Sequence, residues 1–383
     1  MLPCRSGKQP AIKTEARLDE RRGRGKLHPA PLAQAGGETK RRSPVRFLCL
    51  ELTQACNNSC LHCYNFWRHG PVSGPDAGRR PLTRADIRSL LKRTQQETRL
   101  EHVGLTGGEP TLRPDFPEIV GDIVDCGLTP VVITNGTRLT PALLSRMPPG
   151  VNYEVTLFSY REALHNALAG NAVFYDVLRN IARIRSYGSY LTVAFVATRR
   201  NALDVFKTVE LGLGVGARGV MYNRVNLGAS ARKNGRRLVP PAMMLKESLG
   251  QLQEAVRKYK VQTACTIPIP PCVVDLDEFP DLHFGWCPRG GAQSYYTVST
   301  TGLLRPCNHS SRVLGDLMVS GFCELSRSAQ SRTFWRTVPD VCRACRHALA
   351  GKCRGGCPAA ADEYYGTPEQ VDPFCALAGT ALP

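Results

Sequence analysis

Apolar positions between residues 45 and 226 follow two alternating patterns. Short β-branched or apolar runs, typical of buried strands, occupy residues 45–53, 102–106, 129–134, 153–158, 190–198 and 219–226. Segments with helical periodicity lie between them, at residues 83–96, 115–126, 141–147, 173–187 and 201–212. Strands that alternate with helices predict an α/β fold with a parallel sheet. About six repeats are too few for a closed eight-fold barrel, so we expect a partial parallel β/α barrel.

The composition of the chain changes at both ends of this repeating region. The first residues are rich in Arg, Lys, Gly, Pro and Ala and lack periodicity, which is typical of disorder. A long helix is predicted at residues 241–259, and cysteines become dense from Cys265 onward. The predicted organisation is a disordered basic tail (1–43), the partial barrel (44–240), a linking helix (241–264) and a small irregular cysteine-rich iron–sulfur domain (265–383).

The formal net charge of +18 raises the question of nucleic-acid binding. Residues 1–46 hold twelve Lys or Arg and four Asp or Glu, so this segment contributes +8. A local run follows at Arg232, Lys233, Arg236 and Arg237. We therefore attribute the charge of residues 1–46 to a solvated tail and expect no nucleic acid as a partner, while the remaining +10 is spread thinly along the chain.

The length of the apolar runs indicates where in the cell the protein is expected. No run of 18 apolar residues exists and no apolar segment follows Met1, so we expect a cytoplasmic protein without a membrane partner. Sixteen cysteines in such a chain favour metal or redox centres over a disulfide framework.

The loop after the first predicted strand holds Cys56, Cys60 and Cys63 in the spacing C-x3-C-x2-C. This spacing is too tight for a regular helix to run between the cysteines, so the loop can point three thiolates at one centre. Soft thiolates favour an iron–sulfur cluster over a hard cation. Because only three ligands are present, one iron of a four-iron cluster is left open. A zinc site with one ligand missing is the alternative.

With His62 before its last cysteine and Tyr64 after it, this loop resembles the signature of radical S-adenosylmethionine (SAM) enzymes. In that family the open iron is chelated by the amino and carboxylate groups of SAM. An electron from the cluster then cleaves SAM to a 5′-deoxyadenosyl radical, which abstracts a substrate hydrogen. The resemblance implies a [4Fe–4S] cluster on the three cysteines, while the protein supplies orientation and excludes side reactions.

A second motif, Gly107-Gly108-Glu109-Pro110, follows the second predicted strand. Two glycines let the backbone approach a ligand closely, although a tight turn alone would also explain them. The family places its motif for the SAM amino group at this point. The resemblance therefore implies that the backbone around Gly107 and Gly108 and the carboxylate of Glu109 hold the SAM ammonium.

Later strand ends supply further candidates by the same resemblance. The candidate contacts to the ribose and methionine of SAM are Thr134, Asn135 and Ser159, and the candidate for adenine, through its backbone, is His62. A turn or capping role is the alternative for each. Relatives often carry an Arg near the start of the fourth helix, where this chain has Ala169. Arg224, near the end of the sixth predicted strand, is a possible substitute.

A second group of cysteines begins at Cys287, in the order C-x14-G-x4-C, C-x2-C-x7-C-x3-C and a final Cys375. Taken alone, these pairs indicate either a zinc ribbon or clusters. The ordered set of seven resembles the SPASM domain, an extension of some radical SAM enzymes that holds two auxiliary [4Fe–4S] clusters. The x7 interval is longer than the x5 most typical of that family.

This resemblance assigns ligands to each auxiliary cluster. The first would take Cys287, Cys307 and Cys357, and the second Cys342, Cys345, Cys353 and Cys375. The first cluster is then one ligand short, and Cys272 on the extended Pro-rich segment 268–271 is our choice. Asp281, His283 or an open iron are the alternatives. Cys49, Cys126 and Cys323 have apolar neighbours and are expected in the core.

The two resemblances together predict a radical SAM enzyme that crosslinks or oxidises a ribosomally made peptide, similar in layout to the maturase of pyrroloquinoline quinone biosynthesis. Three alternatives stay open: formylglycine-generating maturation of a sulfatase, small-molecule or haem-precursor chemistry, and a non-catalytic iron–sulfur electron carrier. The sequence assigns no catalytic acid or base.

The expected partners follow from the predicted chemistry. They are a peptide or protein substrate, an external electron donor such as flavodoxin or ferredoxin, and a separate leader-peptide-binding protein, because the first 43 residues are too few for a winged-helix recognition domain.

Overall fold

The structure is a computed structural model that describes residues 42–69, 76–228, 234–235, 237–285, 287–288 and 290–379. Most of the predicted basic tail and most of the run of basic residues after Gly228 lie outside these ranges. Among the described residues, every helix is too short or too polar to cross a membrane.

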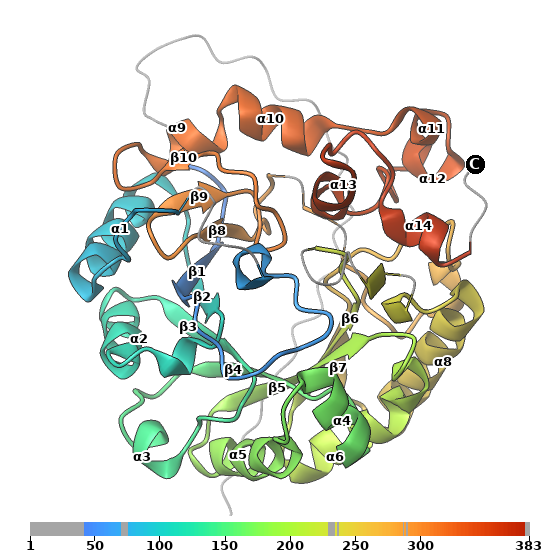
Figure 1. Cartoon of the computed structure of the whole chain (residues 1–383), viewed down its shortest axis with the longest axis horizontal. Helices are drawn as coiled ribbons and strands as arrows, with labels where there is room; N and C mark the ends of the chain where they lie inside the picture. Colours follow the sequence, from blue (N-terminus) through green and yellow to red (C-terminus); the bar gives the residue numbers. More distant parts are fainter. Residues whose placement is uncertain are drawn as a thin grey trace, which may run out of the picture. The chain divides into compact units, whose positions relative to one another are not determined.

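Seven parallel strands form the main sheet, in the same order in space as in sequence (Figure 1). They are β1 (Phe47–Thr53), β2 (His102–Gly107), β3 (Thr129–Thr134), β4 (Asn152–Thr156), β5 (Tyr190–Ala197), β6 (Gly219–Arg224) and β7 (Gln262–Ala264). The parallel α/β architecture predicted from the sequence is thereby confirmed, with the short β7 added after the six predicted strands. All seven strands point the same way, so their carboxyl ends meet at one edge of the sheet.

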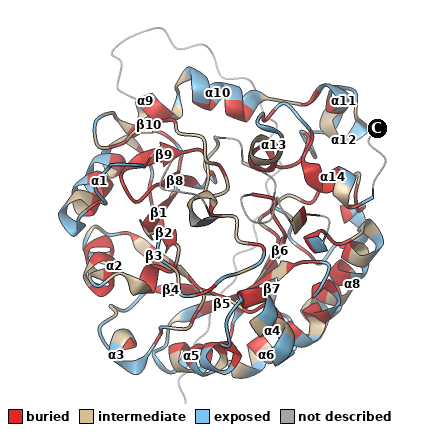
Figure 2. Cartoon of the chain, in the orientation of Figure 1, coloured by how far each residue is buried: buried red, intermediate tan, exposed pale blue. Residues whose placement is uncertain are grey.

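Helices connect these strands and cover the outer side of the sheet (Figure 1). They are α1 (Arg84–Glu97), α2 (Phe116–Asp125), α3 (Pro141–Leu144), α4 (Glu162–Ala169), α5 (Phe174–Ser186), α6 (Val205–Val215) and α8 (Ala242–Tyr259). The side chain of Thr83 caps α1 and exchanges hydrogen bonds with Asp86, which fixes where that helix begins. Buried residues follow the strands and the helix sides that face them (Figure 2), so most of the core lies between the two layers.

The C-terminal region continues the same sheet on the other side of β1. Strand β8 (Tyr296–Val298) runs parallel to β1, with Leu48 opposite Tyr296. Strands β9 (Leu303–Arg305) and β10 (Gly315–Asp316) then add an antiparallel edge. The cysteine-rich region and the barrel therefore share one continuous sheet. The domain boundaries predicted from the sequence stay predictions.

The rest of the cysteine-rich region contains short helices. They are α9 (Phe322–Ser326), α10 (Ala329–Arg336), α11 (Asp340–Arg343), α12 (Arg346–Leu349), α13 (Pro358–Tyr365) and α14 (Pro373–Leu377). In Figure 1 they lie along one side of the sheet, with α13 and α14 near the end of β6.

Two buried ion pairs tie the barrel to this region. Glu51 on β1 pairs with Arg305 on β9, and Arg224 at the end of β6 pairs with Asp372 just before α14. All four side chains are almost fully buried. Burial raises the pKa of Glu51 to about 7, although Arg305 opposes this shift. Breaking either pair would leave a charge buried without a partner, which is strongly destabilising.

Candidate active site at the strand ends

The loop with the first three cysteines follows β1 and is held against the end of α4. The Ser59 and Leu61 N–H groups donate to the carbonyls of Ala169 and Leu168, at 2.9 and 3.2 Å. Gly170 ends α4 with a φ of +65°, and a Cβ there would lie 2.4 Å from the Ser59 carbonyl oxygen. Only glycine fits this close approach without moving the loop.

Local hydrogen bonds shape the loop around its thiols. The Asn58 N–H points at the Cys56 sulfur at 3.5 Å, and the Cys63 N–H donates to the Cys60 carbonyl at 3.2 Å. All three cysteines are neither fully buried nor fully exposed. The loop therefore offers its thiols at the strand-end edge of the sheet, where ligands bind in parallel barrels.

The Gly-Gly-Glu motif is joined directly to the residues that precede this loop. The N–H groups of Gly108 and Glu109 donate to the carbonyls of Thr53 and Ala55, at 2.7 and 2.8 Å. Gly107 has a φ of +129°, and a Cβ on it would lie 2.4 Å from the Thr53 oxygen. A Cβ on Gly108 would lie 2.1 Å from the Ala55 oxygen. The two sequence motifs thus form one continuous backbone structure.

The carboxylate of Glu109 is buried and organises the neighbouring strand ends. Its Oε1 accepts hydrogen bonds from the Thr111 N–H and hydroxyl and from the Thr134 hydroxyl, while Oε2 accepts the Asn135 N–H at 2.8 Å. Burial raises the pKa of Glu109, and these hydrogen bonds counteract the rise. Three of the predicted SAM contacts, Glu109, Thr134 and Asn135, are therefore brought together at the ends of β2 and β3.

Two asparagines that the sequence did not single out complete this region. Asn57, inside the cysteine loop, accepts from Asn135 at 2.9 Å and donates to Thr137 at 2.7 Å. Asn65 donates to the Gly107 carbonyl at 2.6 Å, and its buried Oδ1 has no hydrogen-bond partner among the described residues. Neither residue stands out in the sequence, because a polar residue in a loop is common.

His62, between Cys60 and Cys63 in the loop, is buried. Its ring packs edge-on against Phe158 with the ring centres 4.7 Å apart, and burial lowers its pKa to about 4. The buried Nδ1 of His62 has no hydrogen-bond partner among the described residues. His62 Nδ1 and Asn65 Oδ1 are therefore two buried polar atoms to which a bound cofactor could form hydrogen bonds.

Ser159 and Arg224 are engaged by other parts of the protein. The Ser159 hydroxyl donates to Asp204 at 2.5 Å, and Asp204 also pairs with Arg161. The Arg224 guanidinium donates to Asp372 and to the Pro268 carbonyl. Arg224 therefore joins the barrel to the cysteine-rich region, and its role as a substitute for the missing arginine stays a prediction.

His165 on α4 gives the fold a dependence on pH. Its Nδ1 accepts the Phe158 N–H at 3.3 Å, and its ring packs against Phe174. Burial lowers its pKa from 6.5 to about 4. Between these two values the unfolded chain binds the proton and the folded chain does not, so the free energy of unfolding rises with pH across this window.

We therefore expect acid to destabilise the wild type more than a His165→Asn variant, which keeps an acceptor but does not titrate. Between pH 7 and pH 5 the wild type should lose about 2 kcal/mol more of unfolding free energy. Urea unfolding at the two pH values measures this difference. Equal losses in both proteins would show that His165 does not carry the effect.

The later cysteines form two groups in space. In the first, the pKa of the Cys307 thiol is raised by burial and then by the nearby charges of Cys357 and Cys287. The Cys357 sulfur lies 3.7 Å from the Asn226 amide nitrogen and 3.5 Å from the Ala360 N–H, which both point at it. Such N–H groups tune a cluster bound through the sulfur.

The second group surrounds a narrow cavity that residues of α11 and α12 also line. The cysteines that line the cavity are Cys272, Cys342, Cys345, Cys353 and Cys375. Cys272 and Cys375 form a hydrogen bond that lowers the pKa of the Cys272 thiol to about 7. The structure thus places Cys272 beside the second group and not beside Cys287, where we expected it.

Residues 50–210 match the radical SAM superfamily. The chain therefore contains a radical SAM domain, as its first cysteine motif predicted.

Among its relatives is the PqqA peptide cyclase of Ruegeria pomeroyi, which is 25% identical over 358 residues, covering 90% of this chain and 91% of the relative. The fold is also similar to two solved structures. Streptococcus suis SuiB bound to its precursor peptide SuiA gives a TM-score of 0.66 at 13% identity, covering 86% of this chain and 75% of SuiB. The protein anSMEcpe with bound AdoMet and a Cp18Cys peptide gives a TM-score of 0.66 at 16% identity, covering 88% and 95%.

Proposed function

We propose that this chain is a radical SAM enzyme that modifies a ribosomally made peptide by crosslinking or oxidation. The observation that carries the proposal is the joined pair of motifs, in which the Gly-Gly-Glu turn is hydrogen-bonded to Thr53 and Ala55, just before Cys56. The relative that acts on the PqqA peptide matches almost the full length of this chain. The extent of this match supports a peptide as the substrate class.

Cys56, Cys60 and Cys63 would hold a [4Fe–4S] cluster, and the fourth iron would bind SAM. When bound together, these cofactors supply a carbon radical that abstracts a hydrogen atom from the substrate. Glu109 Oε2, which accepts only the Asn135 N–H among described residues, has an acceptor position left for the SAM ammonium.

The remaining site residues have supporting roles in this proposal. Gly107 and Gly108 bring the backbone close to the methionine part of SAM, and His62 contacts the adenine through its backbone. Thr134, Asn135 and Ser159 are proposed contacts to the ribose and methionine. The burial of Thr134 and Ser159 excludes water from this edge of the site.

Two auxiliary [4Fe–4S] clusters are proposed in the cysteine-rich region. The first would bind Cys287, Cys307 and Cys357, which leaves one iron without a thiolate. The second would bind Cys342, Cys345, Cys353 and Cys375, with the Cys272 thiol as a fifth sulfur at the same cavity. The proposed partners are the substrate peptide, a separate leader-peptide-binding protein and a flavodoxin or ferredoxin, and the proposed location is the cytoplasm.

The substrate class is tested with peptides encoded beside this gene. Anaerobic enzyme, dithionite and SAM should convert such a precursor peptide to a product that lacks two hydrogen atoms by mass spectrometry. If only an adjacent sulfatase were modified, at a Ser or Cys that becomes formylglycine, the sulfatase alternative would replace this proposal. If no 5′-deoxyadenosine formed at all, the electron-carrier alternative would stand.

Cys345→Ala separates the roles of the clusters. We expect this variant to release 5′-deoxyadenosine at close to the wild-type rate and to form no modified peptide, because Cys345 lies in the second group of cysteines, apart from the loop at the strand ends. Liquid chromatography of both products measures the two steps. A variant that makes wild-type amounts of product would show that the second auxiliary cluster does not serve the reaction.

A further inference from the structure

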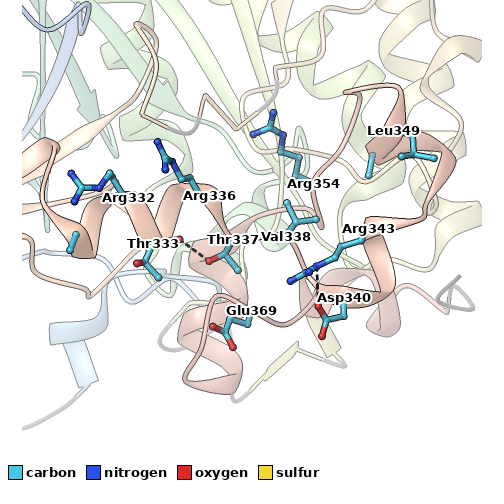
Figure 3. Close-up of a pocket in the computed structure, with 12 residues that line it drawn as sticks. Arg332, Thr333, Arg336, Thr337, Val338, Asp340, Arg343, Leu349, Arg354 and Glu369 are labelled. Carbon is cyan, nitrogen blue, oxygen red and sulfur yellow. Dashed lines mark hydrogen bonds and ion pairs between the residues drawn. The ribbon is translucent and has the colours of Figure 1, made fainter.

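A broad groove of about 860 Å³ opens on the surface of the cysteine-rich region (Figure 3). Helices α10 and α11 and the segment around α12 form its walls. Arg332 and Arg336, one turn apart on α10, lie side by side along it, and Arg343 and Arg354 come from the cysteine-bearing segment. None of the residues that line this groove belongs to the SAM site.

The groove carries an excess of positive charge. Its four arginines face two carboxylates, those of Asp340 and Glu369, which gives a formal charge of +2. Asp340 is already paired with Arg343 at 3.0 Å. Among the described residues, Arg332 and Arg336 form no ion pair with a carboxylate, and both are exposed. Arginines presented in this way attract an acidic surface.

An apolar side chain adds to this surface. Leu349, at the end of α12, lines the groove and is 76% exposed. An exposed apolar side chain among arginines matches the composition of protein interfaces, in which Arg is enriched and the centre is apolar.

The groove is also built on the loop that carries the second group of cysteines. Arg343 lies between Cys342 and Cys345 in the sequence, and Arg354 directly follows Cys353. Neighbouring Cα atoms are about 3.8 Å apart, so both arginines lie within a few ångströms of a cluster ligand. Ala348 lines both the groove and the cysteine cavity. A partner in the groove would therefore sit next to the second auxiliary cluster.

We propose that this groove, defined by Arg332, Arg336, Arg343 and Arg354, is the docking site for a small acidic electron-transfer protein. The partner is a reduced low-potential flavin or iron–sulfur protein. The partner would lose one electron to a cluster held by the second group of cysteines, and no bond or proton would change place. The inference rests on the proposed function, because it requires a cluster on the second group of cysteines. Transient electron-transfer contacts are small and charge-steered, as this groove would allow.

The test uses the full-length, cluster-loaded enzyme and a double variant, Arg332→Glu with Arg336→Glu. Neither residue is a proposed cluster ligand. An acidic flavodoxin, reduced beforehand, is the donor, and stopped-flow absorbance follows electron transfer at low and high salt. At low salt we expect transfer to the double variant to be about ten-fold slower, and the wild-type rate to fall with added salt. Flavodoxin binding, measured by calorimetry, should weaken in parallel.

Arg185→Glu with Arg218→Glu is the matched control, because both arginines are exposed and lie in the helix-covered barrel. This control should accept electrons at the wild-type rate. If the groove variant bound flavodoxin and accepted its electrons as the wild type does, the proposal would be overturned. Dithionite, a small reductant that needs no docking site, should drive SAM cleavage equally in all three proteins. If the wild type did not cleave SAM with dithionite, the proposed function would be contradicted. The calorimetry would still show whether flavodoxin binds at the groove.

Discussion

Cys56→Ala is expected to reduce the release of 5′-deoxyadenosine from SAM to the background of a reaction without enzyme. The cluster would keep only two protein ligands, and the loop would lose the sulfur at which the Asn58 N–H points. The measurement is liquid chromatography of an anaerobic reaction with dithionite and SAM. Iron bound per chain should fall by about four atoms if a four-iron cluster is lost.

Cys126→Ala is the control for this variant. Cys126 follows α2 and belongs to neither group of later cysteines nor to the first loop. It should keep the iron content and the 5′-deoxyadenosine release of the wild type. Wild-type release from Cys56→Ala would show that the first loop does not hold the cluster that cleaves SAM.

Gly108→Ala is expected to destabilise the fold by about 3 kcal/mol and to lose most SAM cleavage. The new Cβ would lie 2.1 Å from the Ala55 carbonyl oxygen and 2.7 Å from that of Gln54, both of them backbone atoms. The chain could relieve this clash only by moving the residues that precede Cys56. Urea unfolding and 5′-deoxyadenosine release measure the two effects.

The chain offers a matched glycine for comparison. Gly121 lies within α2, and no atom lies within 4 Å of the position that its Cβ would take. Gly121→Ala should therefore be neutral or stabilise the protein by about 1 kcal/mol, because alanine favours a helix over glycine. If Gly108→Ala behaved like Gly121→Ala, the close approach of the two motifs would not matter to the site.

Local patterns in the sequence were sufficient to predict most strands and helices of the barrel. The six predicted strands appear as β1 to β6, with ends that differ by up to two residues. The helix predicted from residue 83 begins at Arg84 in the structure, where Thr83 and Asp86 form a capping box within four residues. Buried strands and capped helices leave such short-range signals, so these elements were predictable.

Long-range pairing was not predictable in the same way. Strand β8 has only three residues, and nothing in its sequence shows that it pairs with β1, far earlier in the chain. Arg224 and Asp372 are 148 residues apart and meet only because the C-terminal segment folds over the end of β6. Such contacts depend on the assembled fold.

The candidate site shows the same division. The spacing of the first cysteines and the Gly-Gly-Glu motif predicted both halves of the site. These sequence patterns could not show that backbone hydrogen bonds join the two halves, or that Asn57 and Asn65 connect them further. Cys272 was predicted as a ligand of the first auxiliary cluster, whereas in the structure its thiol meets Cys375 of the second group.

The central claim is that three thiolates of one loop hold a cluster whose fourth iron binds SAM. The most direct test is electron–nuclear double resonance of the reduced, oxygen-protected protein with SAM that carries ¹⁷O in its carboxylate and ¹⁵N in its amino group. The account predicts couplings from both labels to the cluster, and their loss in Cys56→Ala. A reduced cluster without coupling to either label, or a colourless protein that holds zinc, would contradict it.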